Sequence, residues 1–223
     1  MPQTIRERAV QIPPTGLAGD LIVPARAKGV IIFAHGSGSS RHSPRNRHVA
    51  REMQDGGFGT LLLDLLTNAE EEVDLRTRHL RFDIALLSGR LLEATDWLKI
   101  ELGPQFSIGY FGASTGAGAA LVAAIERPAI VQAVVSRGGR PDLAGPTVLR
   151  HVQAATLLIV GGEDHHVIDL NQAALAEMQC EKEMSIVPGA THLFEEPGTL
   201  EQVANLARDW FNRHMTPPST SAE

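Results

Sequence analysis

The feature that most constrains the fold of this chain is an alternation of short apolar runs with helical patterns. Residues 29–34 and 58–66 are continuous apolar runs, which are typical of strands buried on both faces. Stretches with helical periodicity separate such runs, and the alternation repeats about five times along the sequence. Because parallel strands need long crossover connections, this order predicts an α/β fold with a mostly parallel sheet covered by helices on both faces.

The remaining segments complete this prediction. Residues 9–12 and 20–23 are extended candidates separated by a Pro-Pro-Thr-Gly turn, so we expect an antiparallel hairpin at an edge of the sheet. We expect about seven or eight strands in a single domain over residues 1–215, and a flexible tail at residues 216–223. Residues 67–74 are expected to form a loop, in which the charge run Glu70-Glu71-Glu72 is a solvated face. Helices are expected over residues 43–56, with Ser43 as N-cap and Pro44 at the first helical position, and over residues 78–102, 117–125, 146–153, 169–179 and 198–214.

Charge and composition exclude several classes of protein. The net charge is −6 and 43% of the residues are hydrophobic, which argues for a globular protein and against nucleic acid as its main partner. The N-terminus has no apolar signal segment, and no later segment reaches the length of a membrane span. The single cysteine, Cys180, cannot form an internal disulfide and is expected to be an inert thiol in a helix. We therefore expect a cytoplasmic protein without a membrane partner.

Residues 106–120 contain the strongest candidate for a catalytic group. An apolar run ends there in Gly112-Ala113-Ser114-Thr115-Gly116, and an Ala-rich helical pattern follows. This pentapeptide matches the G-x-S-x-G nucleophile elbow, in which glycines allow a helix to start almost on top of the end of a strand. A tight βα turn or a phosphate-binding turn is the alternative interpretation.

Ser114 needs a base and an acid, and the later strand ends supply both. His192 lies in a Gly-Ala-Thr-His turn after the last predicted strand, and Asp164 lies in a Gly-Gly-Glu-Asp turn after the strand before it. The order Ser, Asp, His is that of the α/β-hydrolase arrangement, so we predict Ser114, Asp164 and His192 as the catalytic residues. Asp142 and, less strongly, Glu163 are alternative acids.

A serine hydrolase also needs two N–H groups that stabilise the oxyanion. The residue after the nucleophile, Thr115, is expected to provide one. The loop His35-Gly36-Ser37-Gly38 follows the first parallel strand, and Ser37 is expected to provide the other, with Gly36 as the alternative. This loop lacks the GxGxxG spacing and the lysine of a phosphate-binding loop, so nucleotide binding is not expected.

The other histidines do not predict a second site. His165 and His166 flank Asp164, but the spacing of metal-ligand motifs is missing, so we expect no metal. His35 is expected to be a structural histidine beside the oxyanion loop. The remaining histidines fall on helices or polar loops and are expected at the surface: His42, His48, His79, His151 and His214.

The motifs HGSGSS, GASTG, GGED and GATHLF give the sequence a close resemblance to the α/β-hydrolase superfamily over nearly its whole length. Within it, the chain resembles the small dienelactone hydrolase-like proteins, whose relatives include hydrolase domains fused to phosphoribosyltransferases. The resemblance implies an α/β-hydrolase fold and no cofactor. Members with a cysteine nucleophile act on enol-lactones, whereas Ser114 implies carboxylic esters. Only about 20 residues separate the strands at Ile130 and Thr156, where the superfamily usually inserts a cap domain, so no cap is expected.

Four arginines fall in loops at the predicted reactive edge, and we consider two roles for them. In the first role, one or two of them bind an anionic part of the substrate, because arginine binds carboxylates and phosphates bidentately. The candidates are Arg41, Arg137 and Arg140, with Arg45 in the same region. Alternatively, they pair with Asp142, Glu70 or Glu71 and only fix the loops.

The predicted function is hydrolysis of small or exposed carboxylic esters through an acyl-enzyme. A thioesterase or lactonase would use the same three residues, and a non-catalytic ligand-binding protein could share the fold. The expected partner is a small ester substrate, and the sequence leaves monomer and homodimer open.

Overall fold

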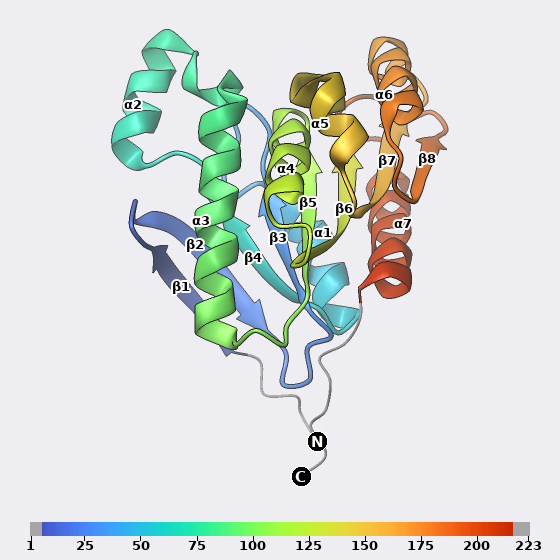
Figure 1. The fold of residues 1–223 in the computed structure, drawn as a ribbon. Coiled ribbons are helices and arrows are strands. Elements are labelled where there is room, and N and C mark those ends of the chain that lie inside the picture. The colour runs from blue at the N-terminus through green and yellow to red at the C-terminus, as the bar shows by residue number, and fades with distance from the viewer. Residues whose placement is uncertain (1–5, 216–223) are drawn as a thin grey trace.

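The computed structural model describes residues 6–215, which build one eight-stranded sheet with helices on both faces (Figure 1). The spatial order of the strands is β1-β2-β4-β3-β5-β6-β7-β8. The pairs β1–β2 and β2–β4 are antiparallel, and every later pair in this order is parallel. The predicted hairpin and the mostly parallel sheet are thus confirmed. The strands are β1 (Arg6–Ile12), β2 (Leu17–Val23), β3 (Val30–Ala34), β4 (Gly59–Leu63), β5 (Ile108–Ala113), β6 (Val131–Arg137), β7 (Ala155–Gly161) and β8 (Lys182–Val187).

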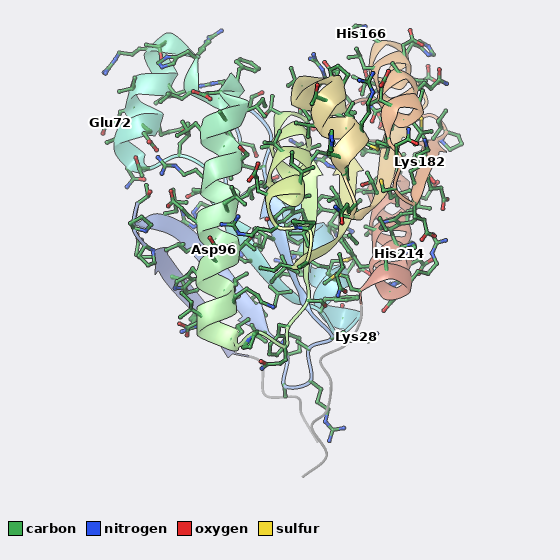
Figure 2. All side chains as sticks on the ribbon, in the orientation of Figure 1. Lys28, Glu72, Asp96, His166, Lys182 and His214 are labelled. Atoms are coloured by element: carbon green, nitrogen blue, oxygen red, sulfur yellow. The ribbon has the colours of Figure 1, made fainter. Side chains whose placement is uncertain are left out.

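The helices form a layer on each face of the sheet. Contacts join α3 to α4, α4 to α5 and α5 to α6 on one face, and α1 to α7 on the other, as Figure 1 shows. Figure 2 shows polar side chains such as Asp96 on the outer sides of these helices. The helices are α1 (Pro44–Asp55), α2 (Asn68–Thr77), α3 (Ile84–Leu102), α4 (Thr115–Glu126), α5 (Gly145–His151), α6 (His165–Glu177) and α7 (Thr199–His214), with short 3₁₀ helices η1 (Leu80–Phe82) and η2 (Pro141–Ala144).

Two apolar cores sandwich the central strands. All residues of β3 are buried, and they alternate between the cores: Val30 and Ile32 pack under α3 and α4, whereas Ile31 and Phe33 pack under α1 and α7. This is why the strand reads as a continuous apolar run rather than as an alternating one. The central strands are therefore fixed from both sides, which holds their carboxyl ends in place.

The predicted start of α1 is confirmed. The Ser43 side chain accepts a hydrogen bond from the Asn46 N–H group at 3.3 Å, and Pro44 is the first helical residue. An N-cap oxygen satisfies one of the free N–H groups at the helix start, and proline costs nothing there because its missing N–H has no partner in the first turn.

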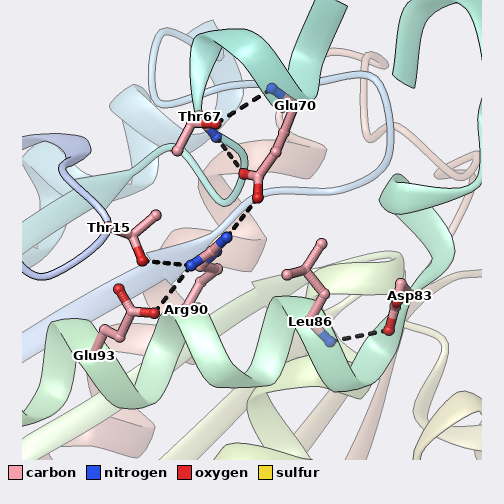
Figure 3. Close-up of polar contacts among 7 residues, drawn as sticks. All are labelled: Thr15, Thr67, Glu70, Asp83, Leu86, Arg90 and Glu93. Carbon is pink, nitrogen blue, oxygen red and sulfur yellow. Dashed lines mark hydrogen bonds and ion pairs between the residues drawn. The ribbon is translucent and has the colours of Figure 1, made fainter. Parts of the chain in front are cut away.

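The prediction of a loop at residues 67–74 is wrong, because α2 covers most of that segment. The Thr67 hydroxyl accepts from the Glu70 N–H group at 3.2 Å, and the Glu70 carboxylate accepts from the Thr67 N–H group at 2.8 Å, which is a complete capping box. The Arg90 guanidinium on α3 joins this helix start to the sheet, since it donates to Glu70 at 2.6 Å and to Thr15 at 2.5 Å (Figure 3). The other face of α2 is solvated, and Figure 2 shows Glu72 there.

The long helix predicted from residue 78 starts six residues later. Arg78 has a left-handed backbone (φ 57°) that ends α2, and η1 follows before α3 begins at Ile84. The buried Asp74 carboxylate holds this corner, because it accepts from the Arg81 Nε atom at 2.5 Å and from the Arg81 N–H group at 3.1 Å.

Three smaller differences concern the later elements. Helix α6 begins at His165 rather than at residue 169, and it ends at Glu177, so Cys180 lies in the following loop and not in a helix. Between β6 and β7 the chain has only the short η2 and α5, so the expected absence of a cap domain holds for this connection. The predicted tail lies outside the described residues. Across residues 6–215, none of the helices combines the length and the apolarity needed to cross a membrane.

Candidate active site

The candidate site lies at the edge of the sheet where the parallel strands end. Ser114, Asp164 and His192 each follow the carboxyl end of a strand, namely β5, β7 and β8. In open parallel sheets this edge is where ligands bind, because the loops that follow the strands converge there. The three residues therefore come from separate loops at one edge of the sheet.

Ser114 has a strained backbone. Its φ of 49° and ψ of −121° lie in a region that residues with a side chain rarely adopt. Two glycines make this turn possible. A Cβ atom at Gly116 would lie 2.3 Å from the Ala34 carbonyl oxygen, and one at Gly112 would lie 2.5 Å from the Ala117 Cα atom. Helix α4 can thus start directly against the ends of β3 and β5, which is the packing that the G-x-S-x-G pattern predicts.

The end of β6 supports the serine turn from the other side. Ala113 pairs with Arg137 in the β5–β6 register, and the Ser114 N–H group donates to the Arg137 carbonyl at 3.3 Å. The Ser114 carbonyl accepts from the Arg140 N–H group at 3.0 Å. Main-chain bonds therefore fix the serine to the end of β6 and to the loop after it, and its side chain makes no capping bond to α4.

His192 and Asp164 lie in direct contact. The His192 Nδ1 atom is 2.6 Å from the Asp164 Oδ2 atom, and the aspartate side chain is 16% exposed while the histidine side chain is 39% exposed. The alternative acids are engaged elsewhere or point away. Asp142 pairs with Arg140 at 2.7 Å, and Glu163 is exposed. Of the three carboxylates considered from sequence, Asp164 is the one that contacts His192.

The loop that carries His192 is held by groups that sequence reasoning missed. The Glu196 carboxylate accepts from the Thr191 N–H group at 3.1 Å and from its hydroxyl at 2.6 Å. Phe194 is buried with a positive φ of 56°, so its ring anchors a strained loop in the core. A Cβ atom at Gly161 would lie 2.4 Å from the Ala190 carbonyl oxygen, so a larger residue would push the loop away from β7. Of these residues, only Gly161 could have been recognised from the sequence, because it lies at the end of a predicted strand.

The predicted oxyanion loop lies against the serine turn. A Cβ atom at Gly36 would lie 3.1 Å from the Ser114 Cβ atom, so the absence of a side chain there permits close approach. His35 fixes this loop: its Nδ1 atom donates to the Gly36 carbonyl at 2.9 Å, and its Nε2 atom accepts from the Leu65 N–H group at 3.1 Å. Burial lowers the pKa of His35, which favours the neutral ring that these bonds require. Both ring nitrogens of His35 are therefore bonded to the backbone, which is the structural role expected from the sequence.

A cavity of about 210 Å³ joins several of the predicted residues. Ser114, His192, Ser37 and Arg137 line it together with the first turn of α1. Thr115 is buried and lines a small crevice beside this cavity, and Ser37 borders both. Thr115 is also the first residue of α4, so its N–H group has no acceptor within the helix. The cavity wall also includes Asn46, a buried residue of α1 that no sequence pattern distinguished.

The loop arginines divide into two groups. Arg140 pairs with Asp142, and Arg41 pairs with Asp64 and lies 3.6 Å from Asp20. These two residues do not line the cavity, and their ion pairs are of the loop-fixing kind that the alternative interpretation describes. Arg45 lines the cavity and pairs with Glu195 at 2.9 Å. Arg137 lines it as well and, in contrast, has no carboxylate partner among residues 6–215.

The remaining histidines form no second centre. His165 and His166 are exposed at the start of α6, where Figure 2 shows His166, and residues 6–215 contain no group of three or more side chains that could hold a metal. His42, His79 and His151 are exposed, as expected. The expectation is wrong for the other two: His48 and His214 are partly buried, and the His214 ring packs on Trp210 with centroids 4.2 Å apart.

Comparison with known proteins gives close relatives, although no protein-family model matches the chain. Two curated proteins from strains of Mycobacterium tuberculosis are 56% identical to it over 220 residues, or 97% of this chain. Both carry a phosphoribosyl transferase name, and the chain spans only 48% of their length.

Two solved structures are similar to the chain. A dienelactone hydrolase from Anabaena variabilis is 57% identical and superposes with a TM-score of 0.91, over 96% of this chain and 100% of that one. The esterase domain of a Rhodothermus marinus protein is 18% identical with a TM-score of 0.73, over 95% of this chain and 99% of that one, so it shares the fold.

Proposed function

Because the chain belongs to the dienelactone hydrolase family of α/β-hydrolases, we propose that it is a serine hydrolase that cleaves carboxylic esters through an acyl-enzyme. The observation that carries this proposal is the 2.6 Å contact between His192 and Asp164 beside a cavity that Ser114 and His192 both line. A serine, a histidine and a partly buried carboxylate in this arrangement are the three chemical types that acyl transfer by serine requires.

The proposed reaction has two halves. His192 takes the proton of the Ser114 hydroxyl while the oxygen attacks the ester carbonyl carbon, and it then gives that proton to the departing alcohol. Water attacks the resulting acyl-enzyme, and His192 again takes the proton and returns it to Ser114. Asp164 accepts a hydrogen bond from His192 Nδ1–H, which orients the ring and stabilises its positive charge.

The main-chain N–H groups of Thr115 and Ser37 are the proposed donors to the oxyanion. Thr115 begins α4, so the positive end of the helix dipole adds to the stabilisation of negative charge. Gly36 remains the alternative to Ser37, because a Cβ atom there would lie 3.1 Å from the Ser114 Cβ atom. Such donors act on the transition state, where the carbonyl oxygen becomes negative.

The absence of a cap between β6 and β7 favours hydrolysis of small or exposed esters. An open site does not exclude water, and water is the second substrate of hydrolysis. The phosphoribosyl transferase name belongs to proteins about twice as long as this chain. The contact between His192 and Asp164, beside the cavity that Ser114 lines, favours ester cleavage for this part.

The direct test replaces the nucleophile. We expect Ser114→Ala to lower kcat for p-nitrophenyl acetate by at least about 10³-fold and to abolish labelling by a fluorophosphonate probe, because only an activated serine reacts with it. Ser40→Ala is a matched control, because Ser40 lies in the oxyanion-side loop but does not line the cavity. Near wild-type turnover by the Ser114 variant would refute the assignment.

Thioesterase, lactonase and non-catalytic binding remain the competing functions. The first two would use the same residues, so a panel of matched esters, thioesters and lactones separates them by kcat/KM. A binding protein would give no probe labelling of the wild-type chain at all.

A further inference from the structure

Asn46 is a buried polar residue of the cavity wall, and its side-chain oxygen has no partner. It lies in the first turn of α1, is 2% exposed, and lines the same cavity as Ser114 and His192. The buried Oδ1 atom makes no hydrogen bond with residues 6–215. The helix start does not need this side chain, because the Asn46 backbone N–H group donates to Ser43 Oγ at 3.3 Å. A buried amide oxygen is costly without a donor, so its donor must come from a molecule that enters the cavity.

A second buried asparagine shows what a structural amide does in this protein. Asn171 on α6 donates through its Nδ2 atom to the Gly139 carbonyl at 2.9 Å and to the Val167 carbonyl at 2.8 Å, so it ties a loop to a helix. Its oxygen also lacks a partner, but Asn171 does not line the cavity. Asn46 differs in both respects, since within the described part of the chain its side chain holds no other segment by a hydrogen bond. Its amide is therefore available to a bound molecule.

The part of the cavity wall around Asn46 consists of neutral polar groups. Ser39 and Ser43 line the same cavity, and a hydroxyl can both donate and accept. Arg45 is the charged residue of this turn, but it is paired with Glu195 at 2.9 Å. An amide offers a donor and an acceptor, and its terminal torsion is soft, so Asn46 can present either end. Neutral groups with both capacities match a hydroxyl group, which also donates and accepts.

We propose that Asn46 binds a hydroxyl group of the substrate, so that the preferred substrates are esters that carry a free hydroxyl close to the scissile bond. This inference rests on the proposed ester hydrolysis and names its substrate class. The distance between hydroxyl and ester is short, because Asn46 and Ser114 line one cavity of about 210 Å³. An apolar substituent in the place of the hydroxyl displaces water and leaves the Asn46 amide without a partner, so the site discriminates against it.

The test compares hydroxylated esters with esters in which a methyl group replaces the hydroxyl. 2-Hydroxyethyl butanoate and propyl butanoate differ on the alcohol side, and ethyl 3-hydroxybutanoate and ethyl 3-methylbutanoate differ on the acyl side. The ratio of kcat/KM within a pair is divided by the ratio of the two alkaline hydrolysis rates, which removes differences in intrinsic reactivity. We expect the wild type to favour the hydroxylated member of at least one pair by about 5-fold or more, as one hydrogen bond to a buried group predicts.

Replacement of Asn46 gives the decisive measurement. Asn46→Leu keeps a similar shape without hydrogen-bonding groups, so it should abolish the preference by lowering kcat/KM for the hydroxylated member more than for the apolar member. Asn46→Ala should have the same effect without branched bulk in the first turn of α1, which guards against a folding defect in the leucine variant. Asn205→Leu removes an exposed amide on α7, outside the cavity, and should leave the preference intact.

Three outcomes would overturn the proposal. The first is a wild type with no preference in either pair, and the second is a preference that survives both Asn46→Leu and Asn46→Ala at unchanged rates. The third is an equal loss on both members of a pair, which would indicate that Asn46 only maintains the start of α1 or binds the attacking water. If the wild type cleaves none of these esters and escapes fluorophosphonate labelling, the ester hydrolysis itself is wrong, which is a separate result.

Discussion

The Nδ1 atom of His192 lies 2.6 Å from the Oδ2 atom of Asp164, although the two residues are 28 positions apart in the sequence. Backbone bonds between their loops maintain this distance: the Gly162 N–H group donates to the Val187 carbonyl at 2.8 Å, and the Glu163 N–H group donates to the Ala190 carbonyl at 3.0 Å. The backbone of the two loops therefore holds the side chains of His192 and Asp164 close to each other.

Asp164→Asn should lower kcat for p-nitrophenyl acetate by about 10³- to 10⁴-fold, because an amide cannot stabilise the imidazolium and favours the wrong ring tautomer. The fold should be unaffected, as measured by circular dichroism and urea unfolding. Glu163→Gln is the matched control, since Glu163 precedes Asp164 but is exposed, and its activity should remain near wild type. If the two variants lose activity equally, the acid is assigned wrongly.

Gly116→Ala should destabilise the protein by about 1–3 kcal/mol, because the added methyl group would lie 2.3 Å from the Ala34 carbonyl oxygen and 2.5 Å from that of His35. These neighbours are backbone atoms, so they cannot move away from the methyl group by a change of rotamer. Gly89→Ala in α3 is the counterpart: a Cβ atom there has open space, and we expect a gain of about 0.5–1 kcal/mol from helix propensity. Urea midpoints that move in the same direction for both variants would contradict this argument.

The stability of the protein should fall between pH 7 and pH 5 in part through His35. Burial lowers its folded-state pKa below the usual 6.5, so in this range the unfolded chain takes up a proton that the folded chain refuses. The stabilisation is thus present above pH 6.5 and is lost as the pH falls towards the folded-state pKa. The slope reaches at most about 1.4 kcal/mol per pH unit.

Urea unfolding at pH 7, 6 and 5 measures this effect. His35→Gln should be less stable than wild type at pH 7, because it disturbs the bonds to Gly36 and Leu65, but it should lose less stability on acidification. Parallel pH profiles for wild type and variant would show that the acid sensitivity arises elsewhere.

The layered fold and the order of the candidate residues were predictable because they depend on local patterns. A strand buried on both faces has no polar positions, as in β3, and a strand-to-helix turn without room for side chains requires the glycines around Ser114. The charge run of α2 hid a helix start that the sequence does carry, because Thr67 and Glu70 have the spacing of a capping box. The bond from Arg90 on another helix, which also holds this start, could not be predicted from the sequence.

The surroundings of the site were harder to predict, because they depend on contacts between distant segments. The sequence places four arginines at the reactive edge and does not show which of them could bind a substrate. Only the fold shows that Arg140 pairs with Asp142, whereas Arg137 has no carboxylate partner among residues 6–215. The support of the His192 loop by Glu196 likewise needs the turn geometry, since a glutamate in a polar loop has no distinguishing pattern.

The short connection between β6 and β7 has a consequence for how such a protein can acquire new specificity. Residues 138–154 leave the sheet beside Arg137, at the edge where the cavity opens, and a Cβ atom added at Gly145, where η2 ends and α5 begins, would have no neighbour within 4 Å. Extra sequence added at this junction of two short helices would extend outward from the connection between the strands, where insertions are tolerated, without disturbing the strands that hold the reacting groups. An inserted segment could therefore cover the cavity or enlarge it, while the strands and loops that carry the reacting residues stay unchanged.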